Sequence, residues 1–423
     1  MVLFKRFAAS RPFDPRSLRA FPKFLHFRMA DQGREVLGIG VRACMEEYRP
    51  EAAIARWRDF LEQEPGHSMG HVAYGLKDGL EPLASRHQDL FHRPIVRWFA
   101  PLVHAAKEHD QWTVNCAAGA DELAAEVVQA LIGDLEPDLS NITSSTPWRC
   151  TTEREAYLRH ANALMEHLRR GDIYEVNYCV QRVAQLPGWD PFAAATMLLK
   201  NVDAPFASFY RWDEQYALAA SPERFLRFGH GRVWSQPMKG TRPRHVDPAM
   251  DKAEAEQLAS DPKERSENIM ATDVVRNDLS RVGDRGSVRL EELCAVKSHR
   301  QVHQMVSTVS ATLRPGCRPV EAVQAAFPMA SMTGAPKVRA MALIDEHEDQ
   351  SRGLFSGSLG WLGPEGTGDF NVVIRTIEHD AGSGFTRLLS GSALTAACDP
   401  DLEWEECALK ARSVLQAIGH AGA

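Results

Sequence analysis

Hydrophobic and polar residues alternate in two ways over the first 135 positions. Residues 35–41 and 112–119 are short apolar runs typical of β-strands, whereas residues 50–63 and 121–135 carry apolar side chains at helical spacing. The stretch 133–152 is rich in Pro, Ser, Thr and Asn and poor in apolar residues, which predicts a boundary there. No titratable residues before this boundary have a spacing that indicates chemistry, so the candidate site is expected after it.

After the boundary, the pattern begins with a helix and a strand. Thr152 is a suitable N-cap for a helix over residues 153–170, and Gly171 is a suitable end to it. Residues 173–186 then have the pattern of a strand, which places Glu175 and Asn177 on one face. Spacing alone leaves two interpretations of Glu175 open: the floor of a pocket, or an exposed sheet edge.

Residues 221–242 contain a predicted hairpin with an acid at one end and an amine at the other. Strands over residues 223–228 and 231–236 are joined at residues 229–231, where two glycines suit a tight turn. Glu223 begins the first strand and Lys239 lies just beyond the second. Because a hairpin brings its ends together, the two side chains are predicted to face one pocket; the alternative is a surface hairpin with two solvated charges.

Two further helices begin with Asp-Pro and carry a pair of glutamates one turn apart. In the first, which follows Asp261-Pro262, the pair is Glu264 and Glu267; the second, after Asp399-Pro400, carries Glu403 and Glu406. Four carboxylates brought together repel one another unless a cation lies between them, and oxygen ligands without His or Cys suit Mg²⁺. Two independent solvated helix faces remain the alternative interpretation.

The residues between these helices add a histidine and an anion-binding turn. Residues 296–313 are predicted to form a strand that carries His303, a residue more often packed than catalytic. Thr333 and Gly334 precede Pro336, which is predicted to be the first residue of a helix. Free backbone N–H groups at such a helix start suit a carboxylate.

Three strands are predicted near the C-terminal end, over residues 353–363, 369–379 and 385–397. Arg375 lies inside the middle strand and Gly391 inside the last one. A guanidinium among Val and Ile is costly to bury without an anionic partner, and its planar fork is well suited to a carboxylate. Arg375 is therefore a candidate ligand for an acidic substrate.

Composition narrows the function classes. The chain has 423 residues with 49 Lys and Arg against 56 Asp and Glu, a net charge of −7, and no dominant basic block, which argues against nucleic acid as a partner. The eight cysteines form no CxxC pair, which indicates reduced thiols. No apolar run of about eighteen residues exists and residues 1–27 lack a continuous apolar segment, so we expect a cytoplasmic protein without membrane spans.

These features together predict an acidic Mg²⁺ site, cationic groups for a second carboxylate, a lysine nucleophile and a nearby carboxylic acid. The expected substrate is a small dianionic acid, and the expected reaction displaces a poor leaving group such as hydroxyl. Lys239 must then be neutral at some stage. Since an unperturbed ammonium titrates near 10.4, its activation at pH 7 costs about 4–5 kcal/mol unless burial or Mg²⁺ lowers its pKa.

The motifs of residues 150–415 resemble, in order, those of chorismate-utilising enzymes. They are GDIYEVNYCVQR, SPERFL, PMKGTRPR, KERSENIMATDVVRNDLSRV, VHQMVSTV, MTGAPKVRAM, RGLFSGSLGW, DFNVVIRT and DPDLEWEECALKAR. The resemblance implies an α+β fold: a large sandwich of two antiparallel sheets with outer helices. Residues 1–145 would then pack as part of the same sandwich, and residues 146–423 would form the chorismate-binding catalytic region.

The resemblance also implies roles for the candidate residues. Lys239 attacks ring carbon 2 of chorismate while Glu223 protonates the departing 4-hydroxyl, and ammonia then adds at carbon 4. Further catalytic positions are Glu175 and His303. The expected Mg²⁺ ligands are Glu264, Glu267, Glu403 and Glu406. The expected substrate-binding residues are Thr241, Thr333, Gly334, Arg375, Gly391 and Lys410.

Within the family, the chain is most similar to component I of the aminodeoxychorismate synthases, which carry the lysine found here at position 239, whereas anthranilate synthases carry Ala. Glu175 departs from the pattern, because its position is Gln in amino-transferring relatives and Lys in isochorismate synthases. Phe355, Trp361 and Ala397 depart as well. The resemblance implies that a separate glutamine amidotransferase subunit supplies the ammonia. Anthranilate synthase component I, isochorismate synthase and a non-catalytic chorismate-binding subunit remain alternatives.

Overall fold

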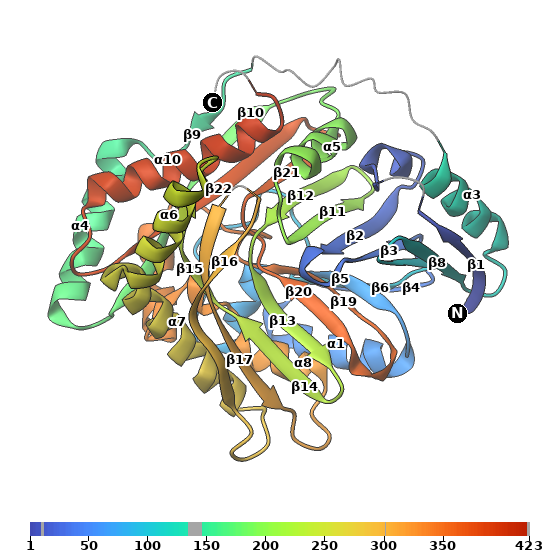
Figure 1. Ribbon diagram of the computed structural model, residues 1–423, viewed down its shortest axis with the longest axis horizontal. Helices are drawn as coiled ribbons and strands as arrows, with labels where there is room; N and C mark the ends of the chain where they lie inside the picture. Colours follow the sequence, from blue (N-terminus) through green and yellow to red (C-terminus); the bar gives the residue numbers. More distant parts are fainter. Residues whose placement is uncertain (10–11, 134–145, 301, 421–423) are drawn as a thin grey trace.

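Two large antiparallel sheets form the centre of the computed structural model, which describes residues 1–9, 12–133, 146–300 and 302–420 (Figure 1). The predicted two-sheet α+β sandwich is therefore confirmed. Most of the predicted boundary at 133–152 lies outside the described residues.

The first sheet contains twelve strands in the order β1-β8-β7-β3-β2-β11-β12-β21-β22-β10-β18, with β9 paired to β10. Strands from both sides of the predicted boundary share this sheet, because β2 pairs with β11. The bounds are β1 Val2–Ala8, β2 Lys23–Met29, β3 Arg34–Ile39, β7 Val103–Glu108, β8 Gln111–Cys116, β9 Arg149–Cys150, β10 Glu175–Gln185, β11 Phe206–Trp212, β12 Gln215–Ser221, β18 Gly334–Ala335, β21 Thr376–Asp380 and β22 Phe385–Leu394.

The second sheet contains ten strands in the order β15-β17-β14-β13-β20-β19-β5-β6-β4, with β16 paired to β17. The predicted hairpin of residues 223–236 is confirmed as β13 and β14, which pair in this sheet. The bounds are β4 Ala43–Glu47, β5 Ser68–Val72, β6 Val96–Ala100, β13 Arg224–Gly229, β14 Arg232–Gln236, β15 Met238–Pro243, β16 Arg289–Ser298, β17 Val302–Thr312, β19 Ser358–Leu362 and β20 Gly368–Asn371.

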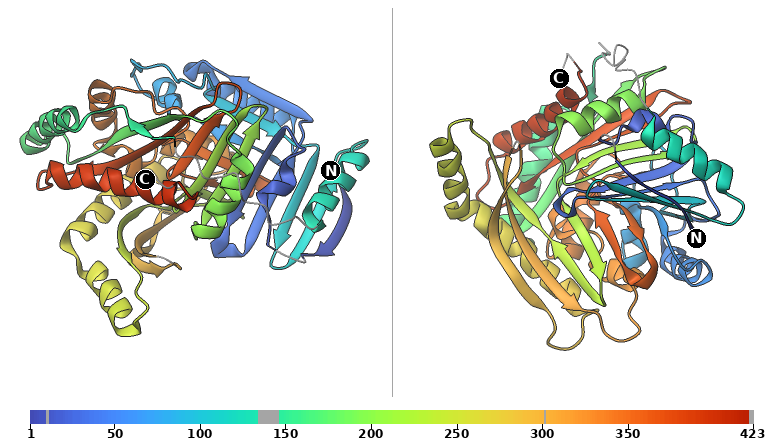
Figure 2. Two further views of the ribbon diagram at one scale, coloured as in Figure 1. Left: turned by 90° about the horizontal axis from the view of Figure 1, so that it is seen from above. Right: turned by 45° about the vertical axis from the view of Figure 1, so that its right-hand side comes forward.

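Helices lie on the outside of the two sheets (Figure 2). Their bounds are α1 Pro50–Gln63, α2 Lys77–Leu80, α3 Asp121–Ile132, α4 Arg154–Arg170, α5 Pro191–Asn201, α6 Pro248–Ser260, α7 Pro262–Ser280, α8 Pro319–Ala326, α9 Lys337–His347 and α10 Pro400–Ala417. None of the helices in the described ranges is both long and apolar enough to cross a membrane.

The alternation of side chains along the strands divides the core into two layers, one between the sheets and one beneath the helices. On β2, Leu25 and Phe27 pack with Leu359 of the second sheet, whereas Phe24 points to the opposite face and packs under α3 and α5. Successive side chains of a strand face opposite sides, so one strand contributes to both the layer between the sheets and the layer beneath the helices. Because both faces of the first sheet are covered, even polar residues of β10 are buried.

The structure corrects four local predictions. Helix α4 begins at Arg154 with Glu153 as N-cap, and the Thr152 hydroxyl instead donates to Asp349. Residues 296–313 form parts of two paired strands, β16 and β17, rather than one strand. Pro336 is the N-cap of α9, not its first residue.

The fourth correction concerns the predicted strand of residues 369–379. It is broken into β20 in the second sheet and β21 in the first. Arg375 lies in the crossover between them with a φ of 50°, not inside a strand. The apolar residues around it cross from one sheet to the other, so their hydrophobicity reflects burial in both layers.

Candidate active site

The centre of the candidate site is an ion pair between the two sheets. Lys239 lies on β15 and donates a hydrogen bond to the carboxylate of Glu175, the first residue of β10. Their exposed fractions are 9% for Lys239 and 3% for Glu175. Glu175 is therefore buried and does not lie on an exposed edge, since β18 pairs with β10 at this position.

Gly240 lets helix α7 approach this pair. Its φ of 84° favours glycine, and a Cβ atom there would lie 2.8 Å from Glu264 Oε2. A side chain at position 240 would push α7, and the two glutamates it carries, away from Lys239.

The pKa of Lys239 is raised, not lowered as a nucleophile would require. Burial favours the neutral amine, but the charges of Glu175, Glu267 and Glu223 outweigh it and hold the pKa above its ordinary value. Burial by itself therefore does not make Lys239 neutral in the protein alone. The resting state of Lys239 is an ammonium ion.

Glu223 lies in the bend between β12 and β13, where its backbone carbonyl accepts from Val372 N. Its side chain is buried, and burial raises its pKa to about 7 against the opposing influences of Ser331 and Lys239. A carboxyl group with this pKa is largely protonated below neutral pH, so Glu223 is able to donate a proton.

The starts of α7 and α10 lie side by side. Asp261 and Asp399 accept hydrogen bonds from the first backbone N–H groups, so the predicted Asp-Pro starts of both helices are confirmed. Lys263 Nζ lies 3.4 Å from Glu403 Oε1 and 3.9 Å from Glu267 Oε1, and so joins the two acidic pairs. Sequence reasoning missed Lys263, although it stands directly beside Glu264.

Three of the four carboxylates, Glu264, Glu267 and Glu403, have raised pKa values. Burial and the neighbouring charges of Glu175 and Glu264 raise the pKa of Glu267 to about 7. Burial and the Glu406 charge also raise the pKa values of Glu264 and Glu403. For Glu406 itself, burial is outweighed by the ion pair with Lys410, and its pKa is lowered.

The donor types fit a hard cation. Glu267 Oε1 is buried without a hydrogen-bond partner, and a cation among these acids would relieve their repulsion. Within the described ranges, however, no three His, Cys, Asp or Glu side chains are gathered closely enough to hold a metal ion as they stand. Lys263 and Lys410 now partner the acids, so a metal ion would have to displace these ammonium groups.

Arg375 offers a cationic group without a partner. In the described part of the chain its guanidinium forms no ion pair or hydrogen bond, and burial lowers its pKa. The anionic partner that the sequence predicts is therefore not a protein group among the described residues.

Lys410 and Gly391 hold α10 against β22. Lys410 Nζ donates to the Gly391 carbonyl at 2.9 Å and pairs with Glu406 Oε1 at 2.7 Å. A Cβ atom at Gly391 would lie 2.7 Å from Asn177 Oδ1, so only glycine allows this packing. Both partners of the Lys410 ammonium group are thus protein groups, the Gly391 carbonyl and the Glu406 carboxylate.

The remaining predicted positions are distributed around the pair. Thr333 is fully buried and its hydroxyl donates to Met329 O, while Gly334 pairs with Val176 of β10. Thr241 is exposed on β15. These three stay predicted substrate-binding residues.

His303 is buried on β17, and its hydrogen bonds go to residues other than Lys239 and Glu175. Its ring nitrogens contact Ser298 Oγ at 2.9 Å and Asp251 Oδ1 at 3.0 Å. Both nitrogens therefore have protein partners, and the catalytic role of His303 stays a prediction.

Arg352 is a supporting residue that sequence reasoning missed. Its guanidinium donates to Met332 O at 2.6 Å and Asn177 O at 2.8 Å and pairs with Glu348. It thereby ties β10 to the segment before β18. The only available signal was its place at the start of the RGLFSGSLGW motif.

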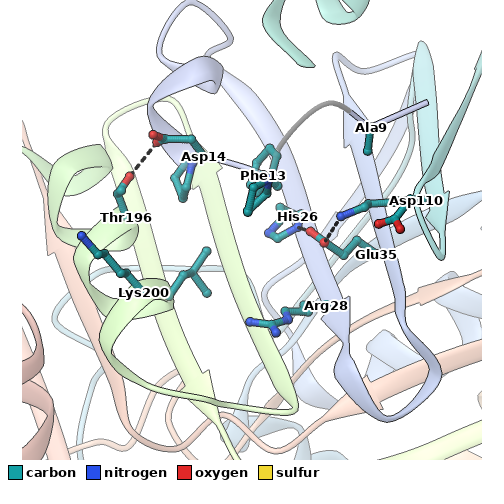
Figure 3. A pocket seen from close by; sticks show the side chains of 13 residues that line it. Ala9, Phe13, Asp14, His26, Arg28, Glu35, Asp110, Thr196 and Lys200 are labelled. Carbon is teal, nitrogen blue, oxygen red and sulfur yellow. Dashed lines mark hydrogen bonds and ion pairs between the residues drawn. The ribbon is translucent and has the colours of Figure 1, made fainter. Parts of the chain in front are cut away.

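A separate hollow of about 820 Å³ lies elsewhere, by β2 and α5 (Figure 3). Its lining includes Asp14, His26, Glu35, Thr196 and Lys200, and His26 Nε2 pairs with Glu35 Oε2 at 2.8 Å. None of the predicted site residues lines it, so it is not the candidate active site.

Comparison with known proteins gives consistent matches. The family model described as chorismate binding enzyme matches residues 11–416. The chain is 37% identical over 345 residues to an aminodeoxychorismate synthase of Streptomyces griseus, which covers 81% of this chain and 46% of that one. It is 38% identical over 282 residues to aminodeoxychorismate synthase component 1 of Klebsiella aerogenes, covering 67% and 62%. The chain thus spans about half the length of these relatives.

The fold matches a solved structure over nearly its full length. Anthranilate synthase component I from Streptococcus pneumoniae superimposes with a TM-score of 0.79 at 20% identity, covering 97% of this chain and 99% of that chain. At this identity the likeness concerns the fold alone.

Proposed function

Because this chain belongs to the chorismate binding enzyme family, we propose that it converts chorismate and ammonia to 4-amino-4-deoxychorismate. The observation that carries the proposal is the buried amine of Lys239 within electrostatic range of a buried carboxyl group, Glu223, that is still partly protonated at neutral pH. The two are close enough for each charge to shift the other's pKa. A nucleophile and an acid in one buried site suit displacement of a hydroxyl group.

The first step joins Lys239 to the substrate. Its neutral amine attacks ring carbon 2 while Glu223 protonates the 4-hydroxyl, which leaves as water. Glu175 is hydrogen-bonded to Lys239 Nζ and accepts the proton that the ammonium must lose. Proton transfer within this hydrogen bond is the step that converts the resting ammonium into a nucleophile.

The second step places nitrogen on the ring. Ammonia adds at carbon 4, the bond between Lys239 and carbon 2 breaks, and the Glu223 carboxylate takes up the proton released by the new amine. The sum is chorismate plus ammonia giving 4-amino-4-deoxychorismate plus water. Glu223 ends in its starting protonation state, and Glu175 returns its proton to the released Lys239 amine, which restores the resting ion pair.

The two carboxylates of chorismate need cationic partners. Glu264, Glu267, Glu403 and Glu406 would hold Mg²⁺, which when bound supplies positive charge for one substrate carboxylate. Arg375 receives the other, because its guanidinium has no partner among the residues that the structure describes, so no described group offsets the cost of its burial. Lys410 supports this end of the site through α10.

The ammonia comes from a separate glutamine amidotransferase subunit. The Klebsiella aerogenes relative is named component 1, which supports a second component in that system. We extend the arrangement to this chain.

One experiment tests the proposal: the protein is incubated with chorismate, Mg²⁺ and an ammonium salt, and the products are identified by mass. The expected product contains nitrogen and keeps the enolpyruvyl group. Anthranilate, which lacks that group, would identify an anthranilate synthase instead. Isochorismate or unchanged chorismate would refute amino transfer, and Lys239→Ala is expected to abolish aminodeoxychorismate formation.

A further inference from the structure

A small, partly open cavity lies beside Glu223, on the side of α7 and α8. It has room for about one water-sized molecule, with roughly 10 Å³ available to that molecule's centre. Its walls include Val275 of α7, Phe225 of β13, Ala326 at the end of α8, and Ala330 and Ser331 of the segment after α8. Glu223 lines it, whereas Lys239, Glu175 and the four predicted metal ligands do not. The cavity therefore shares only the acid with the site described above.

Two polar groups of this cavity call for a hydrogen-bonding occupant. Ser331 is 6% exposed; its hydroxyl lies against the Glu223 carboxyl group and lowers the pKa of that group, and its Oγ has no further partner among the described residues. The Glu223 carboxyl group is 5% exposed and lies next to it. A small molecule that both donates and accepts hydrogen bonds would satisfy the two groups, whose burial is otherwise costly.

The rest of the lining selects for a neutral occupant. Val275, Ala326, Met329 and Ala330 are apolar, and a cation among them would lose its hydration. Arg224 and Ser235 line the cavity as well, and the positive charge of Arg224, which is paired with Asp369, also disfavours a cation there. Asp278 also lines the cavity, but its carboxylate is already paired with Lys337 Nζ at 2.7 Å, and Lys337 donates to Ala326 O as well. Ammonia meets these requirements, whereas the ammonium ion does not.

We propose that this cavity is an ammonia pocket, which holds the neutral nucleophile against Glu223 and receives the water that leaves carbon 4. The proposal rests on the proposed function. The leaving hydroxyl takes its proton from Glu223 and becomes water; ammonia then bonds to carbon 4 and returns one proton to the Glu223 carboxylate. Both small molecules have the size of the cavity and exchange through it.

Nucleophile size provides the first test. The wild-type protein is expected to use ammonia and to reject methylamine, because the cavity has no room for a methyl group. Val275→Ala enlarges the cavity and is expected to increase methylamine turnover at least about tenfold, giving a product heavier by one methylene group. Val274→Ala is the matched control, since Val274 is the adjacent residue of α7, packs against the same core and does not line the cavity.

The second test makes the cavity smaller by placing a larger side chain at position 275. Val275→Ile is expected to raise the KM for ammonium at least about tenfold while leaving the KM for chorismate unchanged, and Val274→Ile is expected to change neither. If the wild-type protein forms no nitrogen-containing product, the proposed function fails. If it does form one, and the Val275 variants match their controls in both assays, the ammonia pocket is refuted while the function stands.

Discussion

Replacing Glu175 by Gln tests the electrostatics of the site directly. The substitution keeps the shape of the side chain and removes one negative charge from the buried pair with Lys239. Since Glu175 is the main charge that raises the pKa of Lys239 against the effect of burial, we expect that pKa to fall. Gln is also the residue that the resemblance associates with amino-transferring relatives at this position.

The size of the fall follows from the energetics of buried pairs. Removing one partner of a buried ion pair costs about 3–5 kcal/mol, and one pKa unit corresponds to about 1.4 kcal/mol, so a fall of about 2–4 units is expected. Glu267 and Glu223 still favour the ammonium form, so the lower end applies. The neutral share of Lys239 at pH 8 should then rise about a hundredfold.

Carbamylation by cyanate measures this share, because cyanate reacts with neutral amines. The extent of modification at Lys239 would be followed by peptide mass from about pH 6 to about pH 10, in the wild type and in Glu175→Gln. Lys337 is the internal control, since its pairing with Asp278 is untouched. An unchanged or smaller extent of modification of Lys239 in the variant at every pH would refute the assignment of Glu175 as the controlling charge.

The same assay, paired with turnover, examines the role of Glu175 as proton acceptor. If Glu175 takes the proton of Lys239, the turnover of Glu175→Gln should fall at neutral pH and recover as the pH rises. A variant faster than the wild type at every pH would show that the carboxylate only restrains the amine.

Three other predictions concern stability and substrate binding. The pKa of Glu223 is raised from 4.5 to about 7 on folding, so the wild type loses about 3 kcal/mol of stability from this group as the pH rises from about 4.5 to about 7; Glu223→Gln removes that loss, and urea unfolding at both ends of the range measures it. Mg²⁺ is expected to raise Tm at pH 8 more than NaCl of equal ionic strength, because it relieves repulsion among the acids of α7 and α10; an equal rise in Glu267→Gln would contradict this site. Arg375→Met is expected to raise the KM for chorismate about 10–100-fold, the value of a charge-assisted hydrogen bond, with partial recovery in Arg375→Lys; an unchanged KM would exclude Arg375 from carboxylate binding.

The sequence determined the elements whose signals are local. The two Asp-Pro helix starts, the glycine end of α4 and the hairpin of β13 and β14 are confirmed, because an N-cap, a left-handed C-cap and a tight turn depend on a few adjacent residues. The residue types of the candidate chemistry, an amine and several carboxylates, were likewise visible. Even so, the sequence misplaced Arg375, because an apolar run does not reveal where a strand leaves one sheet for another.

Only the tertiary structure decided the protonation of these groups. Glu175 and Lys239 are 64 residues apart in the chain, yet their contact between the two sheets keeps Lys239 charged. Burial, in turn, keeps Glu223 largely neutral below about pH 7. A pKa depends on the distance to other charges and on the loss of water, and both are fixed by packing between distant segments. The cavity beside Glu223 has the same origin, since β13, α7, the end of α8 and the segment after it line it together.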